Sequence, residues 1–451
     1  MAWRLELVKT DSDAAIERIS VCDIGEIVAP GGIDDVGLGL EPSQRILGAI
    51  QRAVVGLQER FLKTKALLCR RADPSLMLKD YRARSVQTLF GPLIIRVPRL
   101  IRPGSRLPVP RFFQSSARSA SGYDEIRSRF GAFMSFRSAE RLIGDLFPLA
   151  VGCSTSTTRR RVLLRAVQIN AEAEGAEADC SALQRSQAVG AIDLGIDTTF
   201  VRSAASTGPR HHEVLIGVGT NEQGSCVKIG GVISMTGSPH KVIQRTLQYL
   251  GQGDATHITT FTDGDKMLRG YLKKAGLAAP PLLDWAHLAR RVQIAKTTAK
   301  GLRCGTNAES RARPLISKTL DSLHWKLWHG NVDGAREAVK KIAKLLRPFD
   351  IGITRARTAI PAKRLQTAMG KLGDYIEGQS AHLVDYGLRH RQGQSIGTST
   401  TEGLANTLVN QRMNKLQQMR WSAAGAHAVI VVRAHYINAA NSSPSALDKA
   451  A

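Results

Sequence analysis

The spacing of hydrophobic and polar residues changes several times along the chain and divides it into helix-forming and strand-forming stretches. Between residues 42 and 68, apolar residues recur at steps of three and four, which predicts an amphipathic helix. Residues 86–97 form two apolar runs around Gly91-Pro92, which predicts a β-hairpin. Residues 123–170 return to helical periodicity, and a strand-rich region begins near residue 189.

Short apolar segments after residue 189 predict a β-sheet. The expected strands are 189–197, 213–219, 226–233, 257–263 and 282–284. Helical patterns occur near 242–250, at 266–275 and through His287. The order β-β-β-α-β-α-β-α predicts an α/β fold with a ribonuclease-H-like mixed sheet, in which a three-strand meander is extended by parallel βα units.

These patterns predict the following organisation of the chain. A helical N-terminal region (1–80), loosely ordered over its first forty residues, leads into a basic β-hairpin and extended arm (81–120) and a helix-turn-helix-like region (121–170). An acidic linker at 172–179 precedes the first part of the ribonuclease-H-like core (186–300). A helical insertion (301–396), the second part of the core (397–440) and a frayed tail (441–451) follow.

The charge balance narrows the class of partner. The chain has 63 Lys and Arg against 38 Asp and Glu, a formal net charge of +25. A chain this basic usually binds a polyanion, first of all nucleic acid. A membrane is disfavoured because no apolar run of about 20 residues occurs. The N-terminus lacks the apolar core of a signal peptide, and none of the six cysteines forms a C-x2-C pair, so we expect a cytoplasmic protein with reduced thiols.

Two basic segments are candidate DNA contacts. From Tyr81 to Ala120 the chain has eight Arg and no Asp or Glu, which favours an arm on DNA phosphates over a solvated loop. Its candidate contacts are Arg96, Arg99 and Arg102. A helix at 139–147, a break at 148–152 and a second helix carrying Arg159, Arg160 and Arg161 fit either a helix-turn-helix or a plain helical hairpin.

Three acidic residues occupy positions suited to metal-dependent chemistry. Asp197 and Asp263 end strands expected to be neighbours, and Glu402 opens a helix after a Gly-Thr-Ser-Thr-Thr loop. Carboxylates of this kind hold Mg²⁺, and a pair of such ions can drive an in-line displacement at phosphorus. Alternatives remain: Asp193 faces the same side as Asp197, Asp263-Gly264 is a common turn dipeptide, and Ser399-x-x-Glu402 fits a capping box.

Several stretches resemble the ISKra-type insertion-sequence transposases of the DDE class, which are related to the mutator-like group. The matching stretches are Gly195-Ile196-Asp197-Thr198-Thr199-Phe200-Val201-Arg202, Thr262-Asp263-Gly264-Asp265, Leu283-Asp284-Trp285-Ala286-His287, Thr401-Glu402-Gly403-Leu404-Ala405-Asn406, Asn410-Gln411-Arg412-Met413-Asn414-Lys415 and Gln418-Met419-Arg420-Trp421. They span about 190–425, and weaker similarity reaches back to about residue 80.

The resemblance implies that Asp197, Asp263 and Glu402 form a catalytic triad binding Mg²⁺ or Mn²⁺. Asp284 and His287 match a D-x2-H motif, which implies orientation of the metal ligands or a DNA contact; a structural cap is the alternative. Arg412 and Lys415 are further candidate DNA contacts within the last part of the match. The helical insertion before Glu402 also fits the family.

The function implied is transposition. A water would cut a phosphodiester at the element end, and the freed 3′-OH would attack target DNA. The expected partners are double-stranded DNA, as terminal inverted repeats and target, and further copies of the chain in a synaptic complex at the bacterial nucleoid. Two alternatives remain: a nuclease of the same fold that does not join strands, and a non-catalytic, sequence-specific DNA-binding protein.

Overall fold

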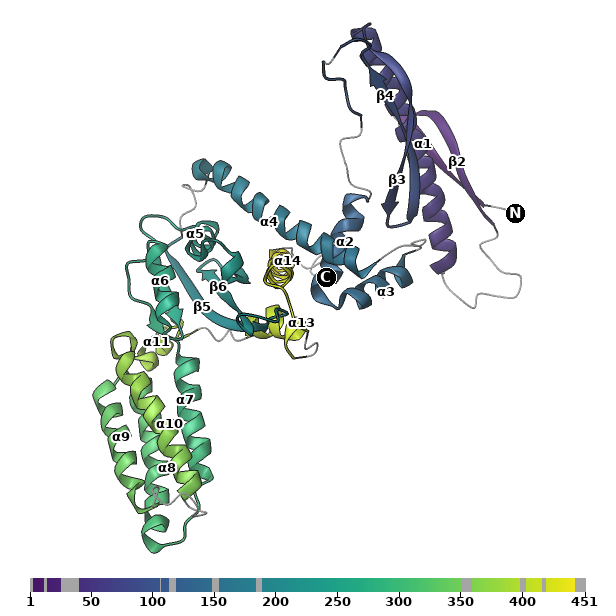
Figure 1. The fold of residues 1–451 in the computed structure, drawn as a ribbon. Coiled ribbons are helices and arrows are strands. Elements are labelled where there is room, and N and C mark those ends of the chain that lie inside the picture. Colours follow the sequence, from purple (N-terminus) through teal and green to yellow (C-terminus); the bar gives the residue numbers. More distant parts are fainter. Residues whose placement is uncertain are drawn as a thin grey trace. The chain divides into compact units, whose positions relative to one another are not determined.

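The protein is described from a computed structural model, which covers residues 3–11, 14–25, 40–105, 107–112, 119–147, 154–183, 189–349, 359–397, 403–415 and 419–442. The chain divides into two compact units, Met1–Arg165 and Ala166–Ala451 (Figure 1). Within the described residues no helix is long and apolar enough to cross a membrane. The expected frayed tail lies beyond residue 442, outside the described residues.

The first unit opens with an antiparallel hairpin of β1 (Trp3–Asp11) and β2 (Ala14–Gly25). This corrects the expectation of a loosely ordered lead-in and of a helical region from residue 1. The pattern that indicated strands is a weak alternation, in which Leu5, Leu7 and Ile19 are half-buried between exposed neighbours. The predicted amphipathic helix is confirmed as α1 (Leu40–Ala72).

The hairpin predicted around Gly91 is confirmed. Strands β3 (Met77–Thr88) and β4 (Gly91–Ile101) pair antiparallel, and Gly91 has a φ of 106° at the turn, a conformation that favours glycine. The hairpin packs on α1, where Leu62, Ile95 and Val97 form a small buried core. The basic segment therefore has a hydrophobic side that fixes it to a helix.

Two further helices, α2 (Ser121–Phe133) and α3 (Phe136–Leu146), and the first part of α4 (Thr155–Leu183) belong to the first unit, which ends at Arg165. The predicted break at 148–152 lies outside the described residues. The acidic stretch 172–179, expected to be a linker, is helical, because α4 continues through it. Its sequence is rich in Ala and Glu, which favour helix.

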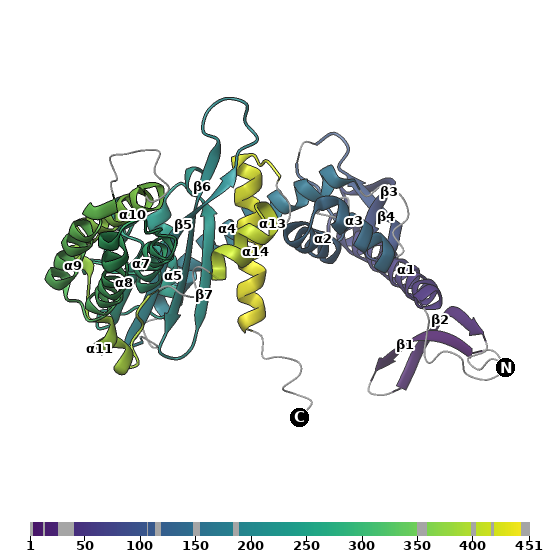
Figure 2. The same cartoon turned by 90° about the horizontal axis from the view of Figure 1, so that it is seen from below.

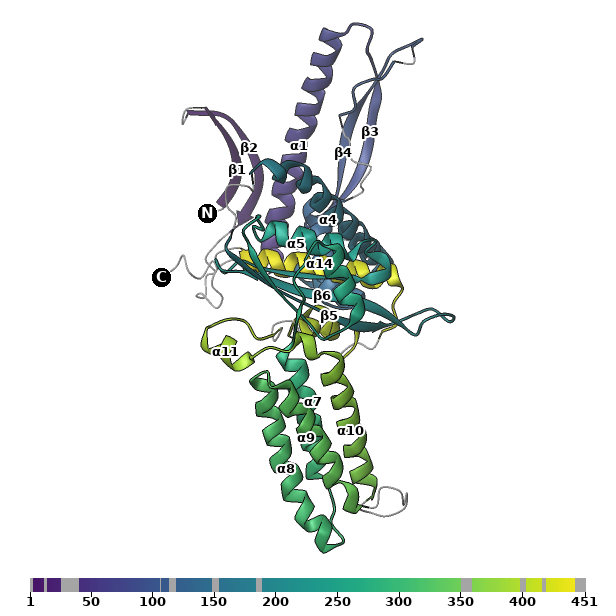
Figure 3. The same cartoon turned by 90° about the vertical axis from the view of Figure 1, so that its left-hand side faces the viewer.

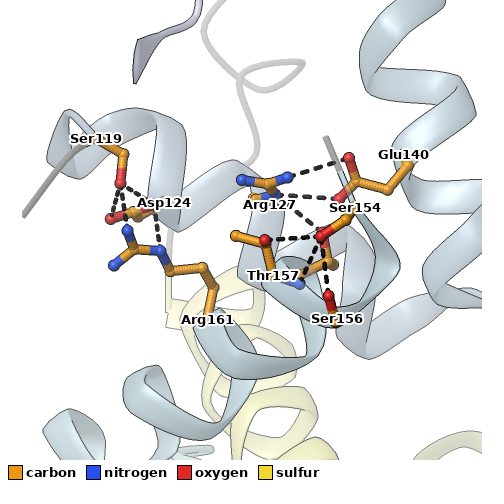
Figure 4. A network of polar contacts seen from close by, with 9 residues as sticks. Ser119, Asp124, Arg127, Glu140, Ser154, Ser156, Thr157 and Arg161 are labelled. Carbon is orange, nitrogen blue, oxygen red and sulfur yellow. Dashed lines mark hydrogen bonds and ion pairs between the residues drawn. The ribbon is translucent and has the colours of Figure 1, made fainter. Parts of the chain in front are cut away.

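Buried polar contacts hold these three helices together (Figure 4). The Arg127 guanidinium on α2 donates to the Glu140 carboxylate on α3 at 3.1 Å and to the Thr158 hydroxyl on α4 at 2.9 Å. The side chains of Arg127 and Glu140 are only 5% and 9% exposed. A buried charge requires such a partner, so this pair fixes how the helices pack.

The second unit contains a mixed sheet, as predicted, which confirms the α/β class. Its strand order among the described residues is β7-β6-β5-β8-β9. The strands are β5 (Ala191–Arg202), β6 (His211–Asn221), β7 (Cys226–Val232), β8 (His257–Thr262) and β9 (Leu282–Leu283). The first three form an antiparallel meander, and β8 and β9 extend it in parallel with β5.

Helices cover both faces of this sheet (Figure 2). On one face, Ile192, Leu194 and Ile196 of β5 pack against α5 (Pro239–Tyr249) and α6 (Lys266–Lys274). On the other face lies α14 (Ala423–Ser442). A Cβ added at Gly230 of β7 would lie 2.8 Å from Ile430, so glycine permits this close approach.

The helical insertion forms a bundle with its own core at one end of the sheet (Figure 3). Its helices are α7 (Trp285–Lys300), α8 (Asn307–Trp328), α9 (Val332–Leu345), α10 (Ala359–Gly378) and α11 (Tyr386–Arg391). Helix α7, expected in the sheet domain, contributes Leu288 and Val292 to the core of the bundle. Judged by its packing, the helical insertion therefore begins directly after β9.

The helical pattern expected at 402–437 is interrupted in the structure. Gly403 begins a helical turn that continues as a π-helical stretch, η5 (Ala405–Asn410), and ends in α13 (Gln411–Met413). Helix α14 starts afresh at Ala423. Among the described residues of the unit, the other short helices are η2 (Ile233–Met235), η3 (Arg347–Phe349) and η4 (Ser380–His382).

Candidate active site

Three aspartates lie level with one another across neighbouring parallel strands. Asp263 and Asp284 directly follow β8 and β9, whereas Asp197 does not end its strand as expected, because β5 continues to Arg202. Gly195 of β5 lies opposite Phe261 of β8, and Thr262 of β8 lies opposite Leu283 of β9. Continuing this register brings Asp197, Asp263 and the residue after β9, Asp284, side by side. The carboxyl ends of parallel strands are where α/β proteins place their ligands, so this sheet edge is the candidate active site.

Asp197 and Asp263 influence each other electrostatically. Burial raises the pKa of Asp263, and the negative charge of Asp197 raises it further. The backbone N–H of Asp265 donates to Asp263 Oδ1 at 2.9 Å and acts in the opposite direction. Two carboxylates that repel each other in a half-buried setting favour a bound cation.

His287 on the first turn of α7 faces the same site. Its Nε2 lies 3.4 Å from Asp197 Oδ2, and both side chains are largely buried. The contact with Asp197 raises the pKa of His287; burial lowers it, and the charges of Asp284 and Asp263 raise it again. A histidine held this way restricts the orientation of the Asp197 carboxylate.

Asp284 is the N-cap of α7. Its Oδ1 accepts the backbone N–H of Ala286 at 2.7 Å, and the residue is 0% exposed. The capping alternative considered from the sequence is therefore confirmed. A direct contact between this side chain and DNA is not supported, because no part of it reaches solvent.

Asp193 differs from Asp197 in its surroundings. The Ser395 hydroxyl donates to Asp193 Oδ2. In the parallel ladder Asp193 lies opposite Thr259, four residues before Asp263. Asp197, level with Asp263, is therefore the better partner for it. The sequence pattern alone left this choice open.

Glu402 lies outside the described residues, together with residues 398–401, so its predicted place in the triad and the capping-box alternative both stay predictions. Among the described residues no group of three or more His, Cys, Asp and Glu side chains is arranged to hold a metal ion. Asp197 and Asp263 nevertheless fit Mg²⁺ or Mn²⁺ in donor chemistry. Magnesium commonly takes one or two carboxylates and completes its shell with water and phosphate.

Side chains of the helical insertion fix the backbone at this sheet edge. The Tyr375 hydroxyl of α10 donates to the Asp263 carbonyl at 2.6 Å, and Gln379 Nε2 donates to the Gly264 carbonyl at 3.2 Å. The Tyr386 hydroxyl of α11 donates to the Leu283 carbonyl at 2.8 Å. These residues were missed by the sequence analysis, since each lies over a hundred positions from its partner and no local pattern marks it.

The predicted DNA contacts have diverse environments. Arg96, Arg159 and Arg160 are exposed, as is Lys415, whose Nζ donates to Asn406 at 3.0 Å. Arg99 and Arg102 form ion pairs with Asp80 and Asp73. Arg161 pairs with Asp124 at 3.0 Å and contacts Ser119, as Figure 4 shows.

Arg412 corrects one expectation. It is only 1% exposed, and its guanidinium carbon lies 4.9 Å from the centre of the Trp421 ring. Burial lowers its pKa to about 10. The residue therefore packs in the interior, where it holds Trp421, and is not presented to DNA.

Comparison with known proteins adds no family assignment. No protein-family model matches the chain, and no curated protein matches it.

Proposed function

We propose that this protein is a DNA transposase of the DDE class with a ribonuclease-H-like catalytic core. The observation that carries the proposal is the pair Asp197, within β5, and Asp263, directly after β8. The register of these adjacent parallel strands brings the two level, and the charge of Asp197 acts on Asp263. The resemblance of the surrounding motifs to ISKra-type transposases supports the same function. So does the net charge of +25, which suits a DNA partner.

In the proposed reaction, a water oxygen attacks the phosphorus at the element end, and the bond from phosphorus to the 3′ oxygen breaks. The released 3′-OH then attacks a phosphodiester of target DNA, whose own 3′ oxygen leaves. Bound Mg²⁺ or Mn²⁺ would supply activation of the attacking oxygen and stabilisation of the leaving oxygen. Asp197, Asp263 and Glu402 would hold the ions, and the protein forms no covalent intermediate.

The other residues of the site position these groups. His287 restricts Asp197, and the hydrogen bond from Tyr375 fixes the backbone of Asp263. Asp284 anchors the start of α7, from which His287 projects. Because residues from several elements fix these side chains, the reacting groups would be held in the alignment that an in-line displacement requires.

The experiment is cleavage and joining of a duplex carrying the element ends, with Mg²⁺. We expect Asp197→Asn, Asp263→Asn and Glu402→Gln to abolish both steps. Asp193→Asn is the matched control, since it lies on the same strand and an amide oxygen can still accept from Ser395. If all three variants cut like the wild type, the assignment of the active site fails.

The same assay separates the alternatives. Cleavage without strand-transfer products would indicate a nuclease of this fold. Tight DNA binding that is insensitive to chelation, with no nicking, would indicate a non-catalytic DNA-binding protein. Transposition would also require pairing of two ends by further copies of the chain, in the cytoplasm at the nucleoid.

The proposed role of α4 in binding DNA has its own test. Arg160 is exposed, whereas the neighbouring Arg161 is paired with Asp124. We expect Arg160→Ala to lower affinity and to reduce the slope of log affinity against log salt by about 0.9, the value for one lost phosphate contact. Arg161→Ala is expected to lower stability and leave this slope unchanged. Equal slopes in all three proteins would exclude Arg160 as a contact.

A further inference from the structure

An aspartate, a histidine and an arginine lie along the side of α7 that faces the candidate active site. Asp284, His287 and Arg291 are spaced by three and four positions, so they lie along one face of the helix. The first caps the helix, and the second contacts Asp197. Arg291 is one turn further on and has no part in the function proposed above.

Arg291 is held close to the acids by an aromatic ring. Its guanidinium carbon lies 4.0 Å from the centre of the Tyr375 ring, within the range of a cation–π contact. The same tyrosine donates its hydroxyl proton to the Asp263 carbonyl. Burial raises the pKa of Tyr375 to about 12, which keeps this hydroxyl protonated as a donor. One side chain therefore connects the arginine to a catalytic aspartate.

The contact with Tyr375 leaves Arg291 able to bind an anion. A guanidinium carries five N–H donors, and the contacts of Arg291 with the ring and hydroxyl of Tyr375 leave others available. Arg291 is exposed, and no carboxylate among the described residues forms an ion pair with it. Arg269, the other arginine near Asp263, is half-buried and donates to Gln379.

We propose that Arg291 binds a non-bridging oxygen of the phosphodiester that is cut, beside Asp197 and Asp263. The inference rests on the proposed function and adds a substrate-binding residue to it. A phosphate placed against the acid pair would meet the guanidinium from the α7 side. Arginine suits this position because its planar fork matches phosphate and remains charged at every relevant pH.

The test is binding of two duplexes that carry the element ends, measured by fluorescence anisotropy with Ca²⁺ in place of Mg²⁺ to prevent cutting. One duplex is native, and the other has a neutral methylphosphonate at the phosphodiester that is cut. We expect the preference of the protein for the native duplex to fall about tenfold in Arg291→Ala, the effect of losing one charge-assisted hydrogen bond.

Arg290→Ala is the matched control. Arg290 is the next residue on the same helix but lies on a different side, where it lines a cleft of about 640 Å³ with Ile294 and His324. We expect this variant to keep the full preference for the charged phosphate. A preference that Arg291→Ala leaves unchanged would overturn the inference, and so would an equal loss in both variants.

Substitutions of Tyr375 test how the arginine is held. Tyr375→Phe keeps the ring beneath Arg291 and removes the hydrogen bond to Asp263, so the preference for phosphate is expected to persist. Tyr375→Leu removes the ring and is expected to lower the preference for the native duplex. The double variant Tyr375→Leu, Arg291→Ala is expected to show little further loss beyond that of Arg291→Ala alone. Failure of the wild type to cut any end-bearing duplex would reject the proposed function itself, whereas wild-type cleavage with an unchanged Arg291→Ala rejects only this inference.

Discussion

The buried cap of α7 allows the structural and chemical roles of one carboxylate to be separated. Asp284 Oδ1 accepts the N–H of Ala286 at 2.7 Å in surroundings that exclude solvent. Asp284→Ala removes this acceptor from the part-buried N–H of Ala286. Asp284→Asn keeps an oxygen at the same position and removes only the charge.

The two changes are expected to differ in stability. A buried donor left without a partner costs about 1–3 kcal/mol, and loss of an N-cap side chain typically costs about 1 kcal/mol within that range. Asparagine caps helices about as well as aspartate, so Asp284→Asn keeps the cap and loses the interactions of the charge. The interaction with the helix dipole is worth about 0.3–1 kcal/mol, and the charge also acts on His287.

Urea unfolding followed by tryptophan fluorescence measures this difference. Trp285 directly follows the cap, and its ring centre lies 4.8 Å from that of Trp328, so the signal reports on this part of the bundle. Gly397→Ala should behave like Asp284→Ala, because an added Cβ would overlap Asp284 Oδ1. The reasoning is refuted if Asn and Ala destabilise equally, or if Asp284→Asn loses cleavage while keeping full stability.

Three further predictions concern other buried ionisable side chains. Burial and the charge of Asp197 raise the pKa of Asp263, so ionisation of Asp263 lowers the stability of the fold as pH rises through the ordinary range of an aspartate. Asp263→Asn should therefore have a higher melting temperature than the wild type in metal-free neutral buffer. It should also lose any stabilisation by Mg²⁺. A lower melting temperature would contradict this. Glu140→Ala leaves Arg127 buried without its carboxylate, and denaturation of the first unit should show a loss of about 3–5 kcal/mol; a loss below 1 kcal/mol would argue that the pair is not tightly packed. Burial lowers the pKa of His427, so the unfolded chain binds the extra proton, and this group should make stability fall as pH drops below about 6.5, by at most about 1.4 kcal/mol per pH unit. Urea titrations at several pH values should show a weaker dependence on pH in His427→Leu than in the wild type, since His324 and His382, whose pKa values burial also lowers, remain.

Several elements could be predicted because their signals are local. The β3–β4 hairpin follows from two apolar runs and a glycine with positive φ between them. The sheet order of the second unit follows from short apolar strands alternating with helices, and the end of β8 marked the position of Asp263. Asp197 was expected at a strand end but lies within β5, which continues to Arg202. The alternation of apolar and polar residues in 3–25 is too weak to have predicted the first hairpin. The acidic composition of residues 172–179 suggested a linker, whereas α4 continues to Leu183.

The sequence by itself determined the class of fold, the strand end that precedes Asp263 and the strongly basic character of the chain. Only the tertiary structure decided that Asp197 is level with Asp263, that Arg412 is buried, and that Tyr375 joins Arg291 to Asp263. The physical reason is the separation along the sequence between the residues that interact. Periodicity reflects which side of one element is buried, whereas register between strands and contacts across a hundred residues arise only when separate elements pack together.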